Sequence, residues 1–136
     1  MRAAHVTVVD TSAIVAVLLE EPGSEAIERE LLQGPCVMSA ATRVELGIAV
    51  EARAGAAGTQ LLEELLARID IRIAPVDEDQ ARDALVCWRR FGKGRHEAAL
   101  NFGDTFAYAL ARQTGQPLLH VGNDFSRTDI TAALSR

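Results

Sequence analysis

The sequence predicts an α/β fold, a three-layer α/β/α sandwich around a central, mainly parallel sheet. Short apolar runs typical of buried strands alternate with longer amphipathic runs typical of helices, which is the pattern of a parallel sheet covered on both faces. The 136 residues suffice for one domain with a sizeable core, and no repeat, low-complexity tract or linker divides them. We therefore expect a single domain over residues 1–136.

The elements follow from the apolar periodicity and from the breaks between runs. Strands are expected at 6–10, 36–38, 71–76 and 117–121. Helices are expected at 11–20, 24–33, 39–54, 59–68, from Asp77 or Asp79 to 91, and at 104–113. A glycine–alanine turn should separate the two middle helices, and 91–103 should be a loop with a short helical middle. From Thr131 onwards we expect a short terminal helix or an edge strand.

Composition and charge restrict the class of protein. The longest apolar run, AIVAVLL, is too short to cross a bilayer, and the N-terminus has no signal-peptide pattern, so we expect a cytoplasmic protein that does not act at a membrane. Cys36 and Cys87 lie far apart without ligand spacing, which predicts reduced, packed thiols and no zinc site. The net charge of −5 does not exclude a nucleic-acid partner if some of the acids bind cations.

Two acids lie at or just beyond the ends of predicted strands. Asp10 is the last residue of the first strand, and Asp124 comes a few residues after the last long strand. Ligands of parallel α/β sheets bind beyond the carboxyl ends of the strands. We therefore expect Asp10 and Asp124 to emerge at the same edge of the sheet.

Two further acids lie on the apolar faces of predicted helices. Glu45 shares a helix face with an apolar stripe, and a carboxylate facing the core is unfavourable unless it has a partner. The stripe consists of Ala41, Val44, Ile48 and Ala49. Asp104 lies on the face that carries Ala107, Tyr108 and Ala111, so it should point inward from the first turn of its helix.

Each of these acids also has an ordinary structural interpretation. Asp10 and Asp104 can cap helices, and Asp124 can stabilise a turn. Glu45 can pair with Arg43 or reach solvent. Four acids that meet at one sheet edge, however, would repel one another and raise each other's pKa. A Mg²⁺ or Mn²⁺ ion prefers oxygen ligands, would remove that repulsion, and can activate water and stabilise a phosphoryl leaving group.

Four segments carry a resemblance to a known family. VVDTSAIVAVLLEEP, TRVELGIAV, LNFGDTFAYALA and LLHVGNDFSRTDI resemble, in order and spacing, the four acidic motifs of PIN-domain ribonucleases. The resemblance is greatest to the VapC toxins of bacterial toxin–antitoxin pairs, and it runs from about residue 6 to 131. The stretch RRFGKGRHEAALNFGD is especially similar to that subfamily.

The resemblance implies a metal-dependent endoribonuclease toxin with one or two Mg²⁺ or Mn²⁺ ions. It would cleave RNA to leave a 5′-phosphate and a 3′-hydroxyl, stop translation and growth, and be neutralised by a VapB-type antitoxin. Homodimers are common in this family. The implied catalytic and metal-binding acids are Asp10, Glu45, Asp104 and Asp124, with Thr11, Ser12 and Asn101 as supporting polar groups. In this family the last acid varies and often acts through water, and Asn123 stands where many relatives carry another Asp.

A basic cluster and several aromatic residues lie near the third motif. The cluster consists of Arg89, Arg90, Lys93 and Arg95, which can contact RNA phosphates or simply form the solvated end of a helix. The aromatic residues are Trp88, Phe91, Phe102 and Phe106. They could stack on bases, but at helical spacing core packing or a dimer contact is the favoured interpretation.

Other classes of protein remain as alternatives. One is a PIN-fold module that binds RNA or metal without toxin activity, and another is a structure-specific DNA nuclease. A phosphorelay receiver would need a lysine near its last strand, whereas the single lysine is Lys93. Haloacid-type phosphohydrolases need a DxDx[TV] motif, and the corresponding run here is DTSAI.

Overall fold

The computed structural model describes residues 6–134 and contains one sheet of parallel strands. The strands are β1 (Thr7–Val9), β2 (Cys36–Ser39), β3 (Ile71–Ala74) and β4 (Leu118–Leu119), in the spatial order β3-β2-β1-β4. Val8 of β1 pairs with Val37 on one side and with Leu118 on the other. The prediction of a mainly parallel sheet is confirmed.

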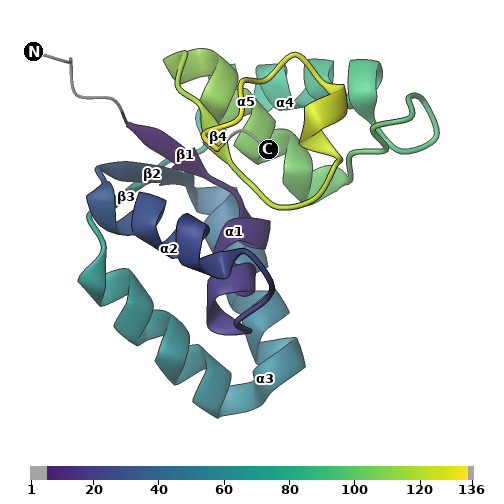
Figure 1. Ribbon diagram of the computed structural model, residues 1–136. Coiled ribbons are helices and arrows are strands. Elements are labelled where there is room, and N and C mark those ends of the chain that lie inside the picture. Colours follow the sequence, from purple (N-terminus) through teal and green to yellow (C-terminus); the bar gives the residue numbers. More distant parts are fainter. Residues whose placement is uncertain (1–5, 135–136) are drawn as a thin grey trace, which may run out of the picture.

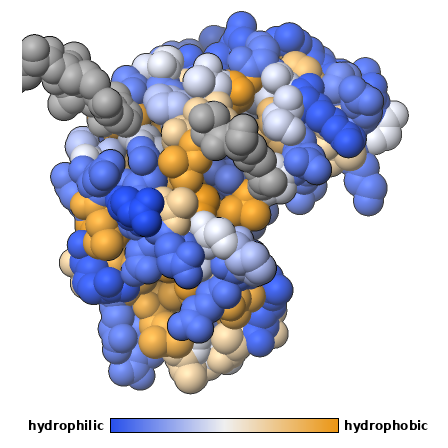
Figure 2. All heavy atoms as spheres, in the orientation of Figure 1, coloured by the Kyte–Doolittle hydropathy of each residue, from blue (hydrophilic) through white to orange (hydrophobic). Residues whose placement is uncertain are grey.

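Helices cover both faces of the sheet (Figure 1). They are α1 (Thr11–Leu18), α2 (Ser24–Gln33), α3 (Ala40–Arg68), α4 (Glu78–Phe91) and α5 (Phe102–Thr114), followed by a 3₁₀ turn, η1 (Phe125–Arg127). Successive strand residues point to opposite faces, so Val9 packs with α1, α2 and α3 while Val8 packs with α4 and α5. The three-layer sandwich is therefore confirmed. Figure 2 shows apolar side chains reaching the surface where the two groups of helices meet.

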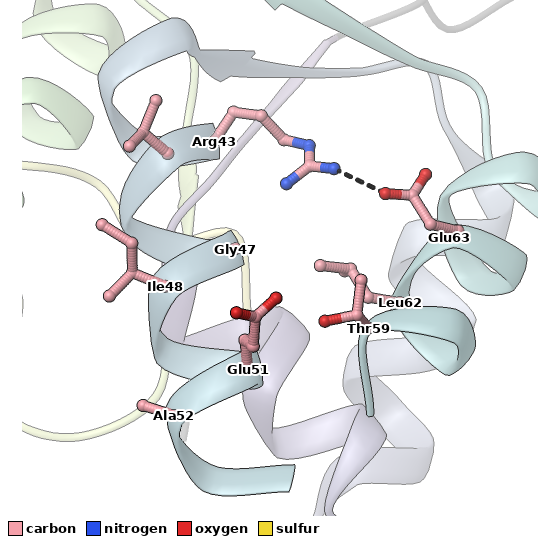
Figure 3. A pocket seen from close by; sticks show the side chains of 9 residues that line it. Arg43, Gly47, Ile48, Glu51, Ala52, Thr59, Leu62 and Glu63 are labelled. Atoms are coloured by element: carbon pink, nitrogen blue, oxygen red, sulfur yellow. Dashed lines mark hydrogen bonds and ion pairs between the residues drawn. The ribbon is translucent and has the colours of Figure 1, made fainter. Parts of the chain in front are cut away.

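In place of the turn predicted between 54 and 59, the helix is interrupted at a single residue, Gly55. The helix α3 runs from Ala40 to Arg68 and bends sharply at Gly55, whose φ of 65° and ψ of −158° interrupt the helix. The two arms of α3 enclose an open cleft of about 600 Å³ (Figure 3). Across this cleft, Arg43 Nη2 lies 3.1 Å from Glu63 Oε1.

Several predicted boundaries differ from the structure. The strand predicted at 117–121 shortens to two residues because Val121 N–H donates to Ser12 Oγ instead of to a strand partner. The segment 91–103 has no helical middle: Lys93 N–H donates to Leu100 O, which closes a compact loop. After Thr131, Ala132 forms a bridge with Leu118, so the edge-strand alternative holds at one position, and residues 135–136 lie outside the described part.

Cys36 and Cys87 are free and buried, as predicted. Burial raises the pKa of Cys36 to about 11 and that of Cys87 to about 12. Within residues 6–134, no helix combines the length and the apolar character that crossing a membrane requires.

Candidate active site

Asp10 lies where β1 ends and α1 begins. It is the N-cap of α1, and its Oδ2 accepts hydrogen bonds from Ser12 N at 3.0 Å and from Ser12 Oγ at 2.6 Å. The capping role considered from the sequence is thus real. It uses one carboxylate oxygen only, so it leaves the second oxygen to be explained.

The second oxygen of Asp10 is buried without a hydrogen-bond partner. The residue is 3% exposed, and its Oδ1 has no donor within the described structure. Burial raises the pKa of Asp10, although the two bonds from Ser12 lower it in part. A buried carboxylate oxygen without a donor is unfavourable unless a proton or a cation binds it.

Glu45 reaches the same end of the sheet from α3. Its Oε1 accepts a hydrogen bond of 2.7 Å from Thr11 Oγ1, the first residue of α1. Burial raises the pKa of Glu45, and the charge of Asp10 raises it further. The alternative pairing of Glu45 with Arg43 is wrong, because Arg43 instead pairs with Glu63.

Glu45 is half-buried for a different reason from the one predicted. Val44 and Ile48, assigned to the core-facing stripe, are 62% and 66% exposed, so that assignment was wrong. The buried face of this arm is formed by Thr42, Leu46 and Val50. Glu45 is half-buried because α1 and α5 pack beside it, and not because it belongs to the apolar stripe.

Asp104 points inward from the first turn of α5, as predicted, but it does not begin the helix. The helix begins at Phe102, and Asn101 caps it: Asn101 Oδ1 accepts from Asp104 N at 2.9 Å, and Asp104 Oδ2 accepts from Asn101 N at 3.0 Å. Burial raises the pKa of Asp104 to about 7, and the charges of Asp10, Glu45 and Asp124 contribute to the rise. Asn101 therefore supports Asp104 through a capping box.

Asp124 is the most exposed of the four acids. It precedes η1, where its side chain forms no capping hydrogen bond. Its charge raises the pKa of both Asp10 and Asp104, so it lies within electrostatic reach of both. The bond from Val121 N to Ser12 Oγ holds this segment against α1, and Ser12 thereby links the Asp124 segment to the Asp10 carboxylate.

The donor set fits a divalent cation. The carboxylates converge without a neutralising lysine or arginine among the causes of their pKa shifts, and the buried Oδ1 of Asp10 needs a positive partner. Among residues 6–134, however, no three acidic, histidine or cysteine side chains are already arranged as a complete ligand set. Water molecules would have to complete the coordination, as is usual for Mg²⁺.

The basic cluster lies at the end of α4 and in the loop that follows it, and its four members are exposed. Arg90 forms an ion pair of 3.4 Å with Asp129, and the Arg95 guanidinium lies 4.7 Å from the centre of the Trp88 ring. Lys93 borders an apolar groove of about 510 Å³ between α4 and α5. The cluster is thus available to a partner, although Arg90 is engaged within the molecule.

The aromatic residues do not behave alike. Phe91 is buried, as expected for core packing, whereas Trp88 and Phe102 are 41% and 79% exposed. Core packing was therefore the wrong interpretation for these two. Phe106 packs edge-on against Phe102 at 5.0 Å between ring centres, and both rings line the groove between α4 and α5.

Sequence reasoning missed Gly103, which lies directly against the carboxylate of Glu45. The signal was a glycine between Phe102 and Asp104 at the start of a helix, where alanine would be favoured. It also missed Asp129, which accepts a hydrogen bond of 2.7 Å from Tyr108 Oη. No local pattern distinguishes that aspartate from a turn residue.

Comparisons with known proteins agree with the fold. The PIN domain model matches residues 7–130. The chain is 46% identical to a Ribonuclease VapC of Mycolicibacterium smegmatis over 126 residues, which are 92% of this chain and 98% of that protein. It is 45% identical to Ribonuclease VapC30 of Mycobacterium tuberculosis over 132 residues, covering 93% and 98% of the two chains.

Solved structures show the same architecture. The Mycobacterium tuberculosis toxin VapC20, described as cleaving the sarcin-ricin loop, matches with a TM-score of 0.73 at 19% identity, over 92% of this chain and 96% of that one. The VapBC2 complex of Rickettsia felis bound to a promoter DNA fragment matches with a TM-score of 0.72 at 13% identity, over 93% and 96%. The match to the PIN domain model over residues 7–130 and the shared architecture define a PIN domain. The chain belongs to the VapC ribonuclease family of PIN-domain proteins.

Proposed function

We propose that the protein is an endoribonuclease toxin whose activity depends on Mg²⁺ or Mn²⁺, with one or two ions bound. Asp10, Glu45, Asp104 and Asp124 would hold the metal. The observation that carries this proposal is the buried Asp10 carboxylate, whose Oδ1 has no donor at the point where β1, α1, α3 and α5 meet. Membership of the VapC ribonuclease family supports RNA as the substrate.

The residues of the site hold their carboxylates ready for a cation. A bound divalent ion would supply Lewis acidity toward the phosphodiester and toward a water molecule. Ser12 fixes one oxygen of Asp10 with two hydrogen bonds, and Thr11 fixes one oxygen of Glu45. Asn101 fixes Asp104 through the capping box. Each acid keeps its remaining oxygen for the ion or for water bound to it.

Binding of Mn²⁺ and cleavage of RNA test this proposal together. We expect Mn²⁺ to raise the melting temperature of the protein and to support cleavage of a structured RNA, and EDTA to abolish both effects. Asp10→Asn should remove both, while Asp79→Asn, a change of an exposed acid on α4, should remove neither. Cleavage that persists in EDTA would contradict the metal requirement, and stabilisation by Mn²⁺ without cleavage would favour the binding-module alternative.

A VapB-type antitoxin is the proposed partner. A groove of about 630 Å³ between α1, α2 and the second arm of α3 has Leu18, Leu61 and Leu65 in its lining and acidic side chains beside them. The acids are Glu20, Glu25, Glu28 and Glu64, and the basic side chain of the lining is Arg68, whose Nη2 lies 3.6 Å from Glu28 Oε2. This combination suits a basic amphipathic segment. Glu25→Lys together with Glu28→Lys should prevent neutralisation by a cognate VapB-type antitoxin without changing RNA cleavage. Unchanged neutralisation would exclude this groove.

A homodimer is proposed on the basis of apolar side chains exposed near the site. Val44 and Ile48 on the first arm of α3, and Phe102 on α5, are all more than half exposed on helices that contact each other. Burying such a surface against a second copy would be favourable. Sedimentation should show a dimer, and Ile48→Asp should shift it toward monomer. A monomeric wild-type protein would contradict the proposal.

The protein is proposed to act in the cytoplasm, where its RNA substrate would lie.

The basic cluster is proposed to contact RNA phosphates. Removing one phosphate-binding side chain should reduce the slope of log affinity against log salt by about one. Lys93→Ala should show this reduction, because Lys93 is exposed beside the α4–α5 groove. A salt slope equal to that of the wild type would remove Lys93 from the binding surface.

A further inference from the structure

Gly103 occupies a position where glycine offers no conformational advantage. It is the second residue of α5, and its φ does not lie in the left-handed region that favours glycine. Glycine inside a helix is less favourable than alanine because it loses more backbone freedom on folding. A reason for glycine at 103 must therefore come from its surroundings and not from its backbone.

The surroundings of Gly103 are the carboxylate of Glu45. A Cβ built on Gly103 would overlap Glu45 Oε2 and would lie 2.5 Å from Cδ and 2.9 Å from Oε1. The Glu45 carboxylate thus fills the space that a side chain at 103 would take. Its Oε1 is held from another direction by Thr11 Oγ1 at 2.7 Å, so α1 and α5 confine it between them.

We propose that Gly103 is a positioning residue, whose missing side chain lets the Glu45 carboxylate lie against the first turn of α5, beside Asp104. With alanine at 103, the carboxylate has to move, and it can do so at little expense because it is the end of a flexible side chain. The fold should therefore tolerate the change, while the ligand set of the proposed cation should not. The inference rests on the proposed metal-dependent function.

Titration of the purified protein with Mn²⁺ tests the proposal without relying on activity. Gly103→Ala should weaken Mn²⁺ binding by about tenfold or more, the range observed when groups that orient metal ligands are removed. The melting temperature of the metal-free protein should stay the same or rise. Gly47→Ala is the matched control, since a Cβ at 47 meets only the Nη1 at the tip of the long Arg43 side chain, at 3.3 Å, and it should leave the affinity unchanged.

A double-mutant cycle shows whether Gly103 acts through Glu45. In a Glu45→Ala background, Gly103→Ala should cause no further decrease in Mn²⁺ affinity, because the displaced group is absent. The shorter side chain of Glu45→Asp should restore part of the affinity that Gly103→Ala removes. Wild-type affinity in Gly103→Ala, or an equal decrease in both backgrounds, would overturn the inference. A wild-type protein that binds no Mn²⁺ would instead overturn the proposed function itself.

Discussion

The carboxylates of Asp129 and Asp10 have opposite surroundings, and their pKa values shift in opposite directions. Asp129 accepts a hydrogen bond from Tyr108 and pairs with Arg90 at 3.4 Å and Arg112 at 3.1 Å. Burial alone would raise the pKa of Asp129, but the bond from Tyr108 and the two guanidinium groups lower it overall. Asp10 has only hydroxyl and amide donors, and burial raises its pKa.

The difference distinguishes a structural carboxylate from one that awaits a ligand. At Asp129 the positive charges are those of Arg90 and Arg112, so the segment after η1 is held against α4 and α5 without a bound ion. At Asp10, Glu45 and Asp104 the charged groups that affect the pKa values are other acids, and under the proposed function a bound cation would supply the positive charge. Variants of Asp10 and Asp129 should therefore differ in activity and in stability.

The largest expected difference is in RNA cleavage. Asp10→Asn should lower the rate at saturating Mg²⁺ by at least about a hundredfold, because the metal contributes several kcal/mol to the transition state. The rate of Asp129→Asn should stay within about threefold of wild type, a difference of well under 1 kcal/mol, because Asp129 is not part of the proposed site. Single-turnover cleavage of one RNA by the two variants measures this. Equal decreases in both variants would erase the distinction.

The next difference is in the sign of the stability change without metal. Asp10→Asn removes a buried charge that has no counter-charge, so the free energy of unfolding in EDTA should rise by about 1 kcal/mol or more. Asp129→Asn weakens two partly exposed ion pairs and should lower it by about 0.5–1 kcal/mol. Urea titration of both variants provides the measurement. A decrease in stability in Asp10→Asn would show that its capping role outweighs the burial of its charge.

Between pH 5 and 8, the acidic site should make the protein less stable as the pH rises. The pKa of Asp104 is raised from 3.8 to about 7, so its protonated form contributes stability that is complete below 3.8 and is lost as the pH rises through 7. The lowered pKa of Asp129 acts in the other direction, and only below about pH 4, near the ordinary pKa of an aspartate.

Metal-free protein should accordingly melt at a lower temperature at pH 8 than at pH 5. Allowing for screening by water, we expect a difference on the order of 1 kcal/mol, or about 3–5 °C. Asp104→Asn should flatten this dependence, and excess Mg²⁺ should remove the fall. A melting temperature that rises over the same interval in EDTA would contradict the raised pKa.

The smallest expected effect is on Cys87, which lies within electrostatic reach of both Asp104 and Asp129. Burial raises the pKa of Cys87 to about 12, and the charges of Asp104 and Asp129 add to this rise. A disulfide reagent at pH 8 should therefore label the native protein far more slowly than the urea-unfolded protein. Asp104→Asn or Asp129→Asn should speed the labelling only slightly, because burial is the larger cause. Rapid labelling of native wild type would show that this part of the core opens readily.

Much of the fold could be predicted because its signals are local. Apolar strand runs, the breaks between the runs and the helix caps indicated nearly every element. The segment NFGD caused the main boundary error, since both Asn101 and Asp104 can cap a helix. The structure uses both in one capping box, with Asn101 outside the helix and Asp104 in its first turn.

The site was only partly predictable. Asp10 and Asp124 follow from the rule that parallel strands end at one edge, which needs only the order of elements. Glu45 was identified for the wrong reason, because its neighbours Val44 and Ile48 face outward. Gly103 and Asp129 depend on contacts between residues 21 to 58 positions apart, and no periodicity within one helix reveals such contacts.

The bend at Gly55 offers a convenient point of attachment. Residues 52–57, around the bend of α3 that lies away from the sheet (Figure 1), are all exposed, and a Cβ on Gly55 would have no neighbour within 4 Å. Exposed tips of this kind tolerate insertions and labels. Since Cys36 and Cys87 are buried, a thiol introduced in place of Ala56 could carry a dye or a surface tether, and single molecules could then be observed capturing RNA at the opposite end.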